Sequence, residues 1–239
     1  MVSKHLNLTH QLVHEIGKEI LKGKYQVGEK LPSEAELSDM YQLSRTATRE
    51  AVKMLTAKGL ISSRPRQGIK VSDKKFWNFF DADVLDWILV GAPDLYMLRH
   101  FLQLRQAIEA QASFLAAQYA SQDDLQQIEQ ALSRMKSAED GHDDTHEADI
   151  EFHKSVLSAT ANPFFIQLKN FIETALRVNV RYTNRFNAVT QDEYQAHAEL
   201  FASIKRGDAQ GAFDASMKTQ TSTLKLVDNA IANMNELSA

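Results

Sequence analysis

Apolar residues recur at helical spacing along most of the 239-residue chain, and this pattern predicts a mainly α-helical protein. The first amphipathic stripe has four residues spaced four apart: Leu8, Leu12, Ile16 and Ile20. Glycine and proline, which most often interrupt helices, number only 9 and 4. Residues 60–71 depart from the helical period and predict two short strands joined by a polar tip.

Residues 31–71 predict two short helices, a turn and a β-hairpin. Ser33 precedes Glu36 by three residues, a capping-box pattern that begins the first helix. Ser44 caps the second helix, residues 45–58. The apolar stripe of this second helix contains Ala47, Ala51 and Leu55. Two helices joined by a tight turn form a helix-turn-helix, whose second helix fits the major groove of DNA.

The second of these helices carries side chains suited to DNA. Arg45 and Arg49 lie four residues apart and therefore share a face, where arginine can read guanine or clamp phosphate. Ser44 and Thr46 suit phosphate oxygens near the start of a helix. The hairpin tip is small and basic enough for a minor groove, with Arg64, Arg66 and Gly68. The alternative is a solvated basic helix beside an ordinary hairpin, but the basic tip favours DNA binding.

Beyond residue 75 the apolar pattern predicts a linker helix and then a helical domain. Residues 76–92 begin with an aromatic cluster and predict a helix whose apolar face docks on the domain that follows. Residues 93–239 carry repeated helical stripes separated by short polar breaks. We therefore expect a DNA-binding head over 1–75, a linker helix over 76–92 and a helical domain over 93–239.

Charge is distributed unevenly along a chain whose formal net charge is −4. Residues 1–75 hold 14 Lys and Arg against 8 Asp and Glu, whereas the remainder holds 13 against 23. This asymmetry is expected of a DNA-binding head on a separate sensing or assembly domain. The absence of cysteine excludes disulfides, zinc–thiolate sites and cysteine nucleophiles. No apolar run approaches the ~18 residues of a membrane span, and we expect a cytoplasmic protein without a membrane partner.

Two residue pairs in the second domain each have the i, i+4 spacing that places polar side chains on one helix face. Asp149 and His153 lie four residues apart on one helix face and could chelate a divalent ion, although a plain Asp–His hydrogen bond has the same spacing. Arg105 and Glu109 are also four apart, at the margin of a buried stripe. Arg105 is therefore either an internal ion-pair partner of Glu109 or a ligand for an anion.

The N-terminal motifs resemble the winged helix-turn-helix of the GntR family of transcription regulators. The resemblance rests on L-P-S-E (31–34), S-R-T (44–46), T-R-E-A (48–51) and G-L-I (59–61). It implies that the arginines of the second helix contact operator bases or phosphates, that nearby hydroxyls support them and that the wing approaches the minor groove. The DNA-binding set expected on these grounds is Ser33, Ser44, Arg45, Thr46, Thr48, Arg49, Arg64, Arg66 and Gly68.

The second domain resembles the FCD ligand-binding domain of the FadR subgroup of that family. The residues that carry this resemblance include R-x-x-x-E (105–109), D-x-x-x-H (149–153), Asn162-Pro163 and His197. The resemblance implies an all-helical bundle of six or seven helices around a central cavity. Many members hold a divalent metal there through one aspartate and three histidines.

Matched residue by residue, Asp149, His153 and His197 correspond to three of those metal ligands, and Gln220 stands at the fourth position. We therefore expect a divalent ion (Zn, Ni or Mn) with open positions for a small carboxylate effector such as a sugar acid. The effector-binding residues expected are Arg105, Asn162 and Gln220. The rival is a metal-free polar pocket in which the same residues bind the acid directly.

The favoured function is a ligand-responsive transcriptional repressor that binds a double-stranded DNA operator as a homodimer. A metal-dependent hydrolase or lyase with a DNA-binding head is the alternative from another class. The sequence offers no nucleophile or general-base constellation for it, so we expect no enzyme and no catalytic residues. A third interpretation is a non-sensing DNA-binding protein whose polar pocket is vestigial.

Overall fold

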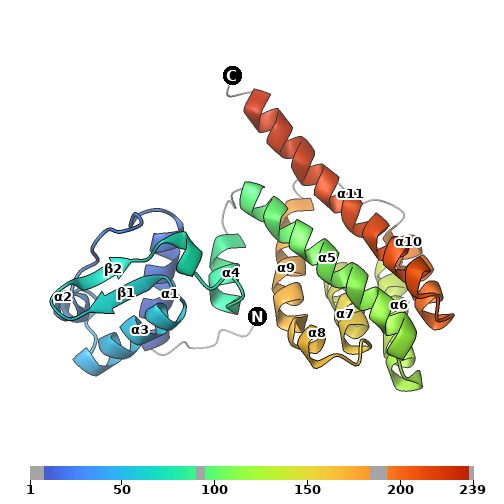
Figure 1. Ribbon diagram of the computed structural model, residues 1–239, viewed down its shortest axis with the longest axis horizontal. Helices are drawn as coiled ribbons and strands as arrows, with labels where there is room; N and C mark the ends of the chain where they lie inside the picture. Colours follow the sequence, from blue (N-terminus) through green and yellow to red (C-terminus); the bar gives the residue numbers. More distant parts are fainter. Residues whose placement is uncertain (1–7, 90–94, 184–192, 237–239) are drawn as a thin grey trace. The chain divides into compact units, whose positions relative to one another are not determined.

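The computed structural model describes residues 8–89, 95–183 and 193–236 (Figure 1). The chain divides into two compact units, Met1–Gly91 and Ala92–Ala239. Helices dominate both units, and the sheet found in the described residues has two strands. This architecture confirms the predicted mainly α-helical class, with a winged helix-turn-helix followed by an all-helical domain.

The first unit combines the helix-turn-helix with its wing. Its elements are α1 (Leu8–Leu21), α2 (Glu34–Met40), α3 (Arg45–Ala57), β1 (Ile61–Arg64), β2 (Gly68–Val71), the 3-10 turn η1 (Lys74–Phe76) and α4 (Ala82–Leu89). The two strands pair antiparallel, with Ile61 opposite Val71 and Arg64 opposite Gly68. The apolar stripe of α1 packs on α3, and the inward side chains of the hairpin close the same core.

Local hydrogen bonds explain where α2 and α3 begin. Ser33 Oγ accepts from Glu36 N at 3.3 Å, and Ser33 N donates to Glu36 Oε2 at 2.7 Å, which is the predicted capping box. Ser44 Oγ likewise accepts from the backbone of α3, from Ala47 N at 3.2 Å. Gly59, after α3, has a φ of +75°, and a Cβ there would overlap a backbone carbonyl. Glycine is therefore required where α3 ends.

Helix α4 packs within the first unit. Val84 and Trp87 belong to the same buried core as the apolar stripes of α1 and α3. The Trp87 ring covers Gly17 of α1 so closely that a Cβ at Gly17 would overlap it. Trp87 Nε1 donates to His14 Nδ1 at 2.7 Å, so the indole is anchored by a hydrogen bond as well as by packing.

The sequence predicted one linker helix over 76–92. Within the described residues a 3-10 turn comes first, α4 begins only at Ala82, and its Trp87 packs on α1. Lys58 at the end of α3 supports this arrangement, because its Nζ lies 2.7 Å from both Asp81 Oδ1 and Asp83 Oδ2. The apolar stripe identified a buried face but could not identify its partner.

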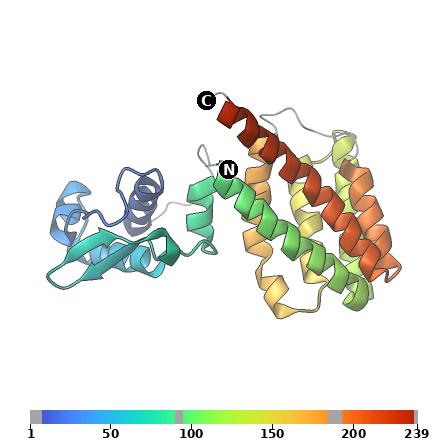
Figure 2. The same cartoon turned by 45° about the horizontal axis from the view of Figure 1, so that its top comes forward.

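The second unit is a bundle built on two long helices. Its elements are α5 (Leu95–Tyr119), α6 (Gln122–Glu139), α7 (Thr145–Ser158), α8 (Pro163–Gln167), α9 (Lys169–Thr183), α10 (Glu193–Lys205) and α11 (Ala209–Glu236). Helices α5 and α11 lie side by side in both views (Figures 1 and 2), while α6 packs on α7, α7 on α9 and α10 on α11. Within the described residues, no helix has the length and apolar character needed to cross a membrane.

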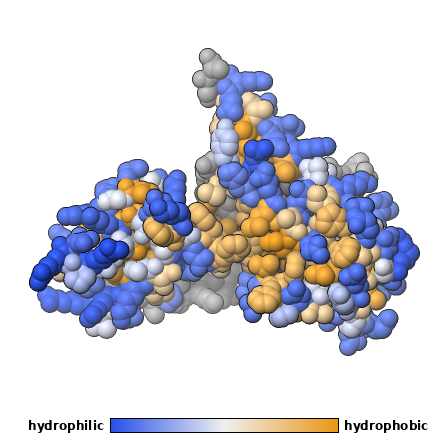
Figure 3. Space-filling model, viewed as in Figure 1, coloured by the Kyte–Doolittle hydropathy of each residue, from blue (hydrophilic) through white to orange (hydrophobic). Residues whose placement is uncertain are grey.

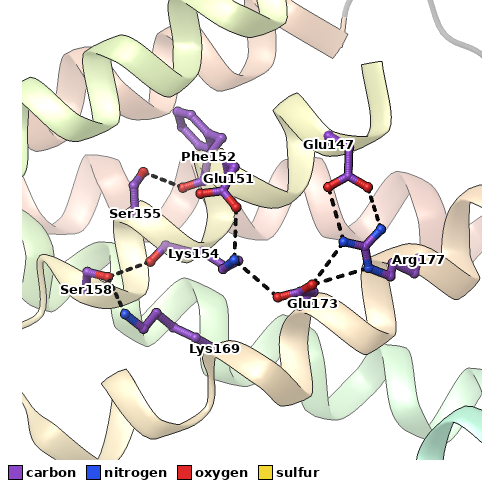
Figure 4. Close-up of polar contacts among 9 residues, drawn as sticks. All are labelled: Glu147, Glu151, Phe152, Lys154, Ser155, Ser158, Lys169, Glu173 and Arg177. Atoms are coloured by element: carbon purple, nitrogen blue, oxygen red, sulfur yellow. Dashed lines mark hydrogen bonds and ion pairs between the residues drawn. The ribbon is translucent and has the colours of Figure 1, made fainter. Parts of the chain in front are cut away.

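Ion pairs join α7 to α9 on the surface of this bundle (Figure 4). Arg177 Nη1 lies 2.5 Å from Glu147 Oε1, and Arg177 Nη2 lies 3.0 Å from Glu173 Oε1. Lys154 Nζ contacts Glu151 at 2.9 Å and Glu173 at 3.2 Å. Solvent-exposed pairs contribute only about 0–1 kcal/mol each. The fully buried apolar side chains of α7 and α9 therefore contribute more to their packing.

We predict that Gly17→Ala destabilises the first unit by about 1–2 kcal/mol, because overpacking against Trp87 outweighs the better helix propensity of alanine. In a Trp87→Leu background, which removes the ring, the same change should stabilise by about 0.5–1 kcal/mol. Urea unfolding of the full chain, with hydrogen exchange of α1 amides, measures both values. Equal effects in the two backgrounds would contradict the packing of Trp87 on Gly17.

Candidate DNA-binding surface and metal-binding cluster

Helix α3 exposes a row of side chains compatible with DNA. Arg45, Thr46 and Arg49 are exposed, and among the described residues no carboxylate pairs with either arginine. The Ser44 hydroxyl oxygen accepts from the backbone, so its O–H remains able to donate to a phosphate oxygen. Cationic donors without acidic partners are what contacts with phosphates and guanine edges require.

Thr48 is a correction to the predicted DNA-binding set. Its side chain is fully buried, and Oγ1 donates to the carbonyl oxygen of Ser44 at 3.2 Å. It lies four residues before the buried Val52, so it belongs to the inner face of α3. Its contribution is to secure the first turn of α3. Ser33, by contrast, is exposed at the start of α2.

The hairpin tip places two further arginines in solvent. Arg64 and Arg66 are exposed, and the turn between the strands is closed by a hydrogen bond from Gln67 N to Arg64 O at 3.1 Å. Arg66 and Gly68 have φ values of +64° and +76°, in the left-handed region that tight turns use. The end of the unit that holds this tip is covered by hydrophilic side chains (Figure 3).

In the second unit, Asp149 and His153 of α7 converge with His197 of α10. Asp149 Oδ1 lies 3.3 Å from His153 Nε2 and 3.4 Å from His197 Nε2, and the two histidine nitrogens are 3.3 Å apart. Neighbouring ligands of a tetrahedral zinc ion, with bonds of ~2.0–2.1 Å, are ~3.3–3.4 Å apart, whereas the right angles of an octahedron give ~3 Å. The three ligand atoms are therefore close enough together for Asp149, His153 and His197 to hold a divalent ion.

Three more side chains complete this buried cluster. Glu109 of α5 accepts from Arg105 Nε at 2.5 Å, from His153 Nδ1 at 2.6 Å and from Gln220 Nε2 of α11 at 2.6 Å. Arg105 Nη2 lies 3.4 Å from His153 Nε2. Arg105 Nη1 is buried and has no hydrogen-bond partner in the described part of the chain. An unsatisfied buried donor costs ~1–3 kcal/mol or more, so this atom points to a ligand.

Burial and charge act in opposite directions on these groups. Burial raises the pKa of Glu109, but the positive charges of Arg105 and His153 outweigh it and lower the pKa to about 2. Burial also raises the pKa of Asp149, which His153 and His197 nevertheless hold below its usual range. Burial lowers the pKa of His153, whereas Glu109 and Asp149 raise it to about 9. An incoming metal must therefore displace a proton from His153 at neutral pH.

A separate hollow of about 440 Å³ lies on the outside of the bundle, between α6, α7 and the start of α9. Two of its cations already have acidic partners, since Arg134 Nε lies 2.9 Å from Asp143 and Lys154 Nζ lies 2.9 Å from Glu151. An acidic ligand would have to break these pairs. The buried cluster, with its unsatisfied guanidinium nitrogen, is the better ligand site.

Most of the predicted second-domain residues meet in this cluster, but Asn162 has only local contacts among those described. Its Oδ1 accepts from Phe164 N at 3.0 Å to cap α8, and its N donates to Thr160 Oγ1 at 3.2 Å. The sequence also missed the central position of Glu109, which had been considered only as a partner of Arg105. Helical spacing connects those two residues but gives no sign of contacts with other helices.

Comparison with known proteins agrees with both units. Residues 8–71 match the family described as bacterial regulatory proteins, gntR family, and residues 100–219 match the FCD domain. The chain is 34% identical over 213 residues to the galactonate operon transcriptional repressor of Escherichia coli strain K12, covering 89% of this chain and 93% of that protein. It is 31% identical over 214 residues to the uncharacterized regulator YieP of the same strain, covering 87% and 90%.

The same fold occurs in a solved structure described by the words "Lar controls the expression of the Listeria monocytogenes agr system and mediates virulence". It is 18% identical, has a TM-score of 0.56, and the match covers 95% of this chain and 99% of that one. The exposed arginines of α3, the wing and the helical bundle thus occur together in a protein whose first part matches the gntR family and whose second part matches the FCD domain. The chain belongs to the GntR family of bacterial transcription regulators, with an FCD domain after its winged helix-turn-helix.

Proposed function

We propose that this protein is a ligand-responsive repressor that binds an operator as a homodimer and responds to a small sugar acid such as an aldonate. In the first unit, α3 would enter the major groove with Arg45 and Arg49 toward the bases or phosphates. Arg64 and Arg66 of the wing would contact the minor groove or the backbone. All four arginines are exposed, and this exposure supports the role. The two arginines of α3 also have no carboxylate partner among the described residues.

The observation that carries the sensing half of the proposal is the buried, unpartnered Nη1 of Arg105 beside the triangle of Asp149, His153 and His197. A divalent ion held by that triangle would lie close to the Arg105 guanidinium. Two positive charges that lie near one another would favour an anion that binds both. A carboxylate can coordinate a metal through one oxygen and accept from arginine through the other.

The 3.3–3.4 Å separations of the ligand atoms are compatible with zinc, which takes nitrogen and carboxylate ligands, and zinc is therefore the ion used in the tests below. The name of the galactonate operon repressor supports an aldonate as the effector class. By thermodynamic linkage, an effector that releases DNA must bind less tightly to the DNA-bound protein.

Dimerisation is supported by apolar side chains exposed on the second unit. Apolar residues gather on its visible face over α5 (Figure 3). The exposed large apolar residues of α5 and α11 include Leu104, Tyr96 and Met234. Apolar exposure of this kind marks interaction surfaces. A pseudo-palindromic operator would match the two-fold symmetry of such a dimer.

Arg49→Ala should weaken operator binding by ~5–150-fold, because each good arginine contact contributes about 1–3 kcal/mol. The measurement is fluorescence anisotropy on a duplex that the wild-type protein has selected from a random library. Arg134→Ala removes the same charge from the second unit and should bind as the wild type does. An unchanged operator affinity of Arg49→Ala would contradict the placement of α3 in the major groove.

His153→Ala should abolish stoichiometric zinc binding while leaving DNA affinity without effector unchanged, because it removes one of three ligands far from α3 in sequence. Zinc content after dialysis, determined by elemental analysis, gives the first value and anisotropy gives the second. The matched control is His142→Ala, which removes an exposed histidine and should retain zinc. Equal zinc content in the two variants would refute the metal site.

A further inference from the structure

Glu109 has more buried partners than an ion pair with Arg105 requires. Its side chain is 4% exposed, and three N–H donors from three different helices reach its two oxygens. Oε1 accepts from Arg105 Nε, while Oε2 accepts from His153 Nδ1 and Gln220 Nε2. An ionised carboxylate accepts only, and its two oxygens have lone pairs for all three donors.

The contact with Glu109 determines which of the two ring nitrogens of His153 carries the proton. Because Nδ1 donates to Glu109 at 2.6 Å, Nε2 is the atom that faces Asp149 and His197. Neutral imidazole has one donor and one acceptor nitrogen, so fixing the proton on Nδ1 leaves the Nε2 lone pair for a metal. Glu109 therefore sets both the tautomer and the ring orientation that coordination needs.

The contact with Gln220 has the same consequence for a carboxamide. Its Nε2 donates to Glu109 at 2.6 Å, and the flipped amide would bring two acceptor oxygens together. The amide orientation is thus fixed, and Oε1 is the atom left to accept. Because Glu109 accepts the N–H groups of both side chains, the acceptor atoms His153 Nε2 and Gln220 Oε1 point away from it.

We infer that Glu109 is the positioning residue of the metal site: it takes the N–H groups of His153 and Gln220, so that both present acceptor atoms to the ion or its bound ligand. This inference rests on the proposed metal-dependent function. Arg105 Nε on the other oxygen supplies the charge that keeps the buried carboxylate ionised.

Two substitutions of Glu109 distinguish the effect of the carboxylate's position from the effect of its charge. Glu109→Asp keeps the charge but withdraws the oxygens by one methylene, and Glu109→Gln keeps the shape but places an amide where acceptors are needed. Both should weaken Zn²⁺ binding by ~10–100-fold, the range measured when partners behind a ligand are lost. Gln220→Met removes one donor, leaves the carboxylate in place and should weaken binding by ~2–10-fold. Ser113→Ala, which removes a hydroxyl bound to the backbone of Glu109, should have no effect.

The experiment is competitive Zn²⁺ titration of the full chain, together with the visible spectrum of its Co²⁺ form and the melting temperature without metal. The Co²⁺ spectrum should change in both Glu109 variants and remain as in the wild type in Ser113→Ala. A purely structural role would lower the metal-free melting temperature and leave the spectrum of the folded fraction unchanged, and that result would overturn the inference.

The outcomes distinguish this inference from the function on which it rests. If the wild-type protein binds neither Zn²⁺ nor Co²⁺, both the metal site and the role of Glu109 are refuted. If the wild type binds and Glu109→Asp binds equally tightly, the metal proposal stands and only the positioning role is refuted. If Glu109→Gln fails to fold, Glu109→Asp and Gln220→Met still decide the question.

Discussion

A carboxylate, a guanidinium and imidazoles share the interior of the second unit, and none of these charges can be buried alone. Removing an ion from water costs several kcal/mol even after the protein relaxes, and the cost is offset only by close partners with good hydrogen bonds. Glu109 provides such contacts to donors on α5, α7 and α11 at once. The need to pair these buried charges constrains how α5, α7 and α11 pack. The same packing positions Asp149, His153 and His197 next to one another.

The same reasoning explains why the cluster resembles a binding site more than a structural ion pair. A structural network would satisfy each donor, and Arg105 Nη1 is left without a partner among the described residues. The cost of that atom is offset if a ligand oxygen binds there. The first unit illustrates the opposite case, since Trp87 has its indole nitrogen satisfied by His14 and its ring packed on Gly17. We interpret that contact as purely structural, and it makes α4 part of the first unit.

The sequence predicted those features that depend on local patterns. The capping box of α2, the glycine after α3 and the apolar stripe of α1 all follow from short spacings, and α3 began and ended close to the expected residues. The sequence did not predict which element packs against a given helix face. Thr48 looks like a polar surface residue, yet it shares an inner stripe with Val52, and the apolar face of α4 gives no sign that it packs on α1.

The candidate site divides in the same way. The i, i+4 pairs of α5 and α7 were visible in the sequence, and the resemblance to the FCD domain joined His197 and Gln220 to them. The contacts of Glu109 across three helices were not visible, because they depend on tertiary packing rather than on spacing. The ion pair of Arg105 with Glu109 does not exclude its role as an anion ligand, since Nε makes the pair and Nη1 has no hydrogen-bond partner among the described residues.

The most direct test of a metal-bridged sensor is the melting temperature of the full chain with D-galactonate and other aldonates, measured with Zn²⁺ and again after chelation. Binding to the folded state alone stabilises by about 2.7 kcal/mol when the ligand is at 100 times its dissociation constant. We expect that one aldonate raises the melting temperature and that chelation abolishes the shift. A shift that survives chelation would contradict the metal-bridged site, and the absence of a shift with any aldonate would contradict the proposed effector class.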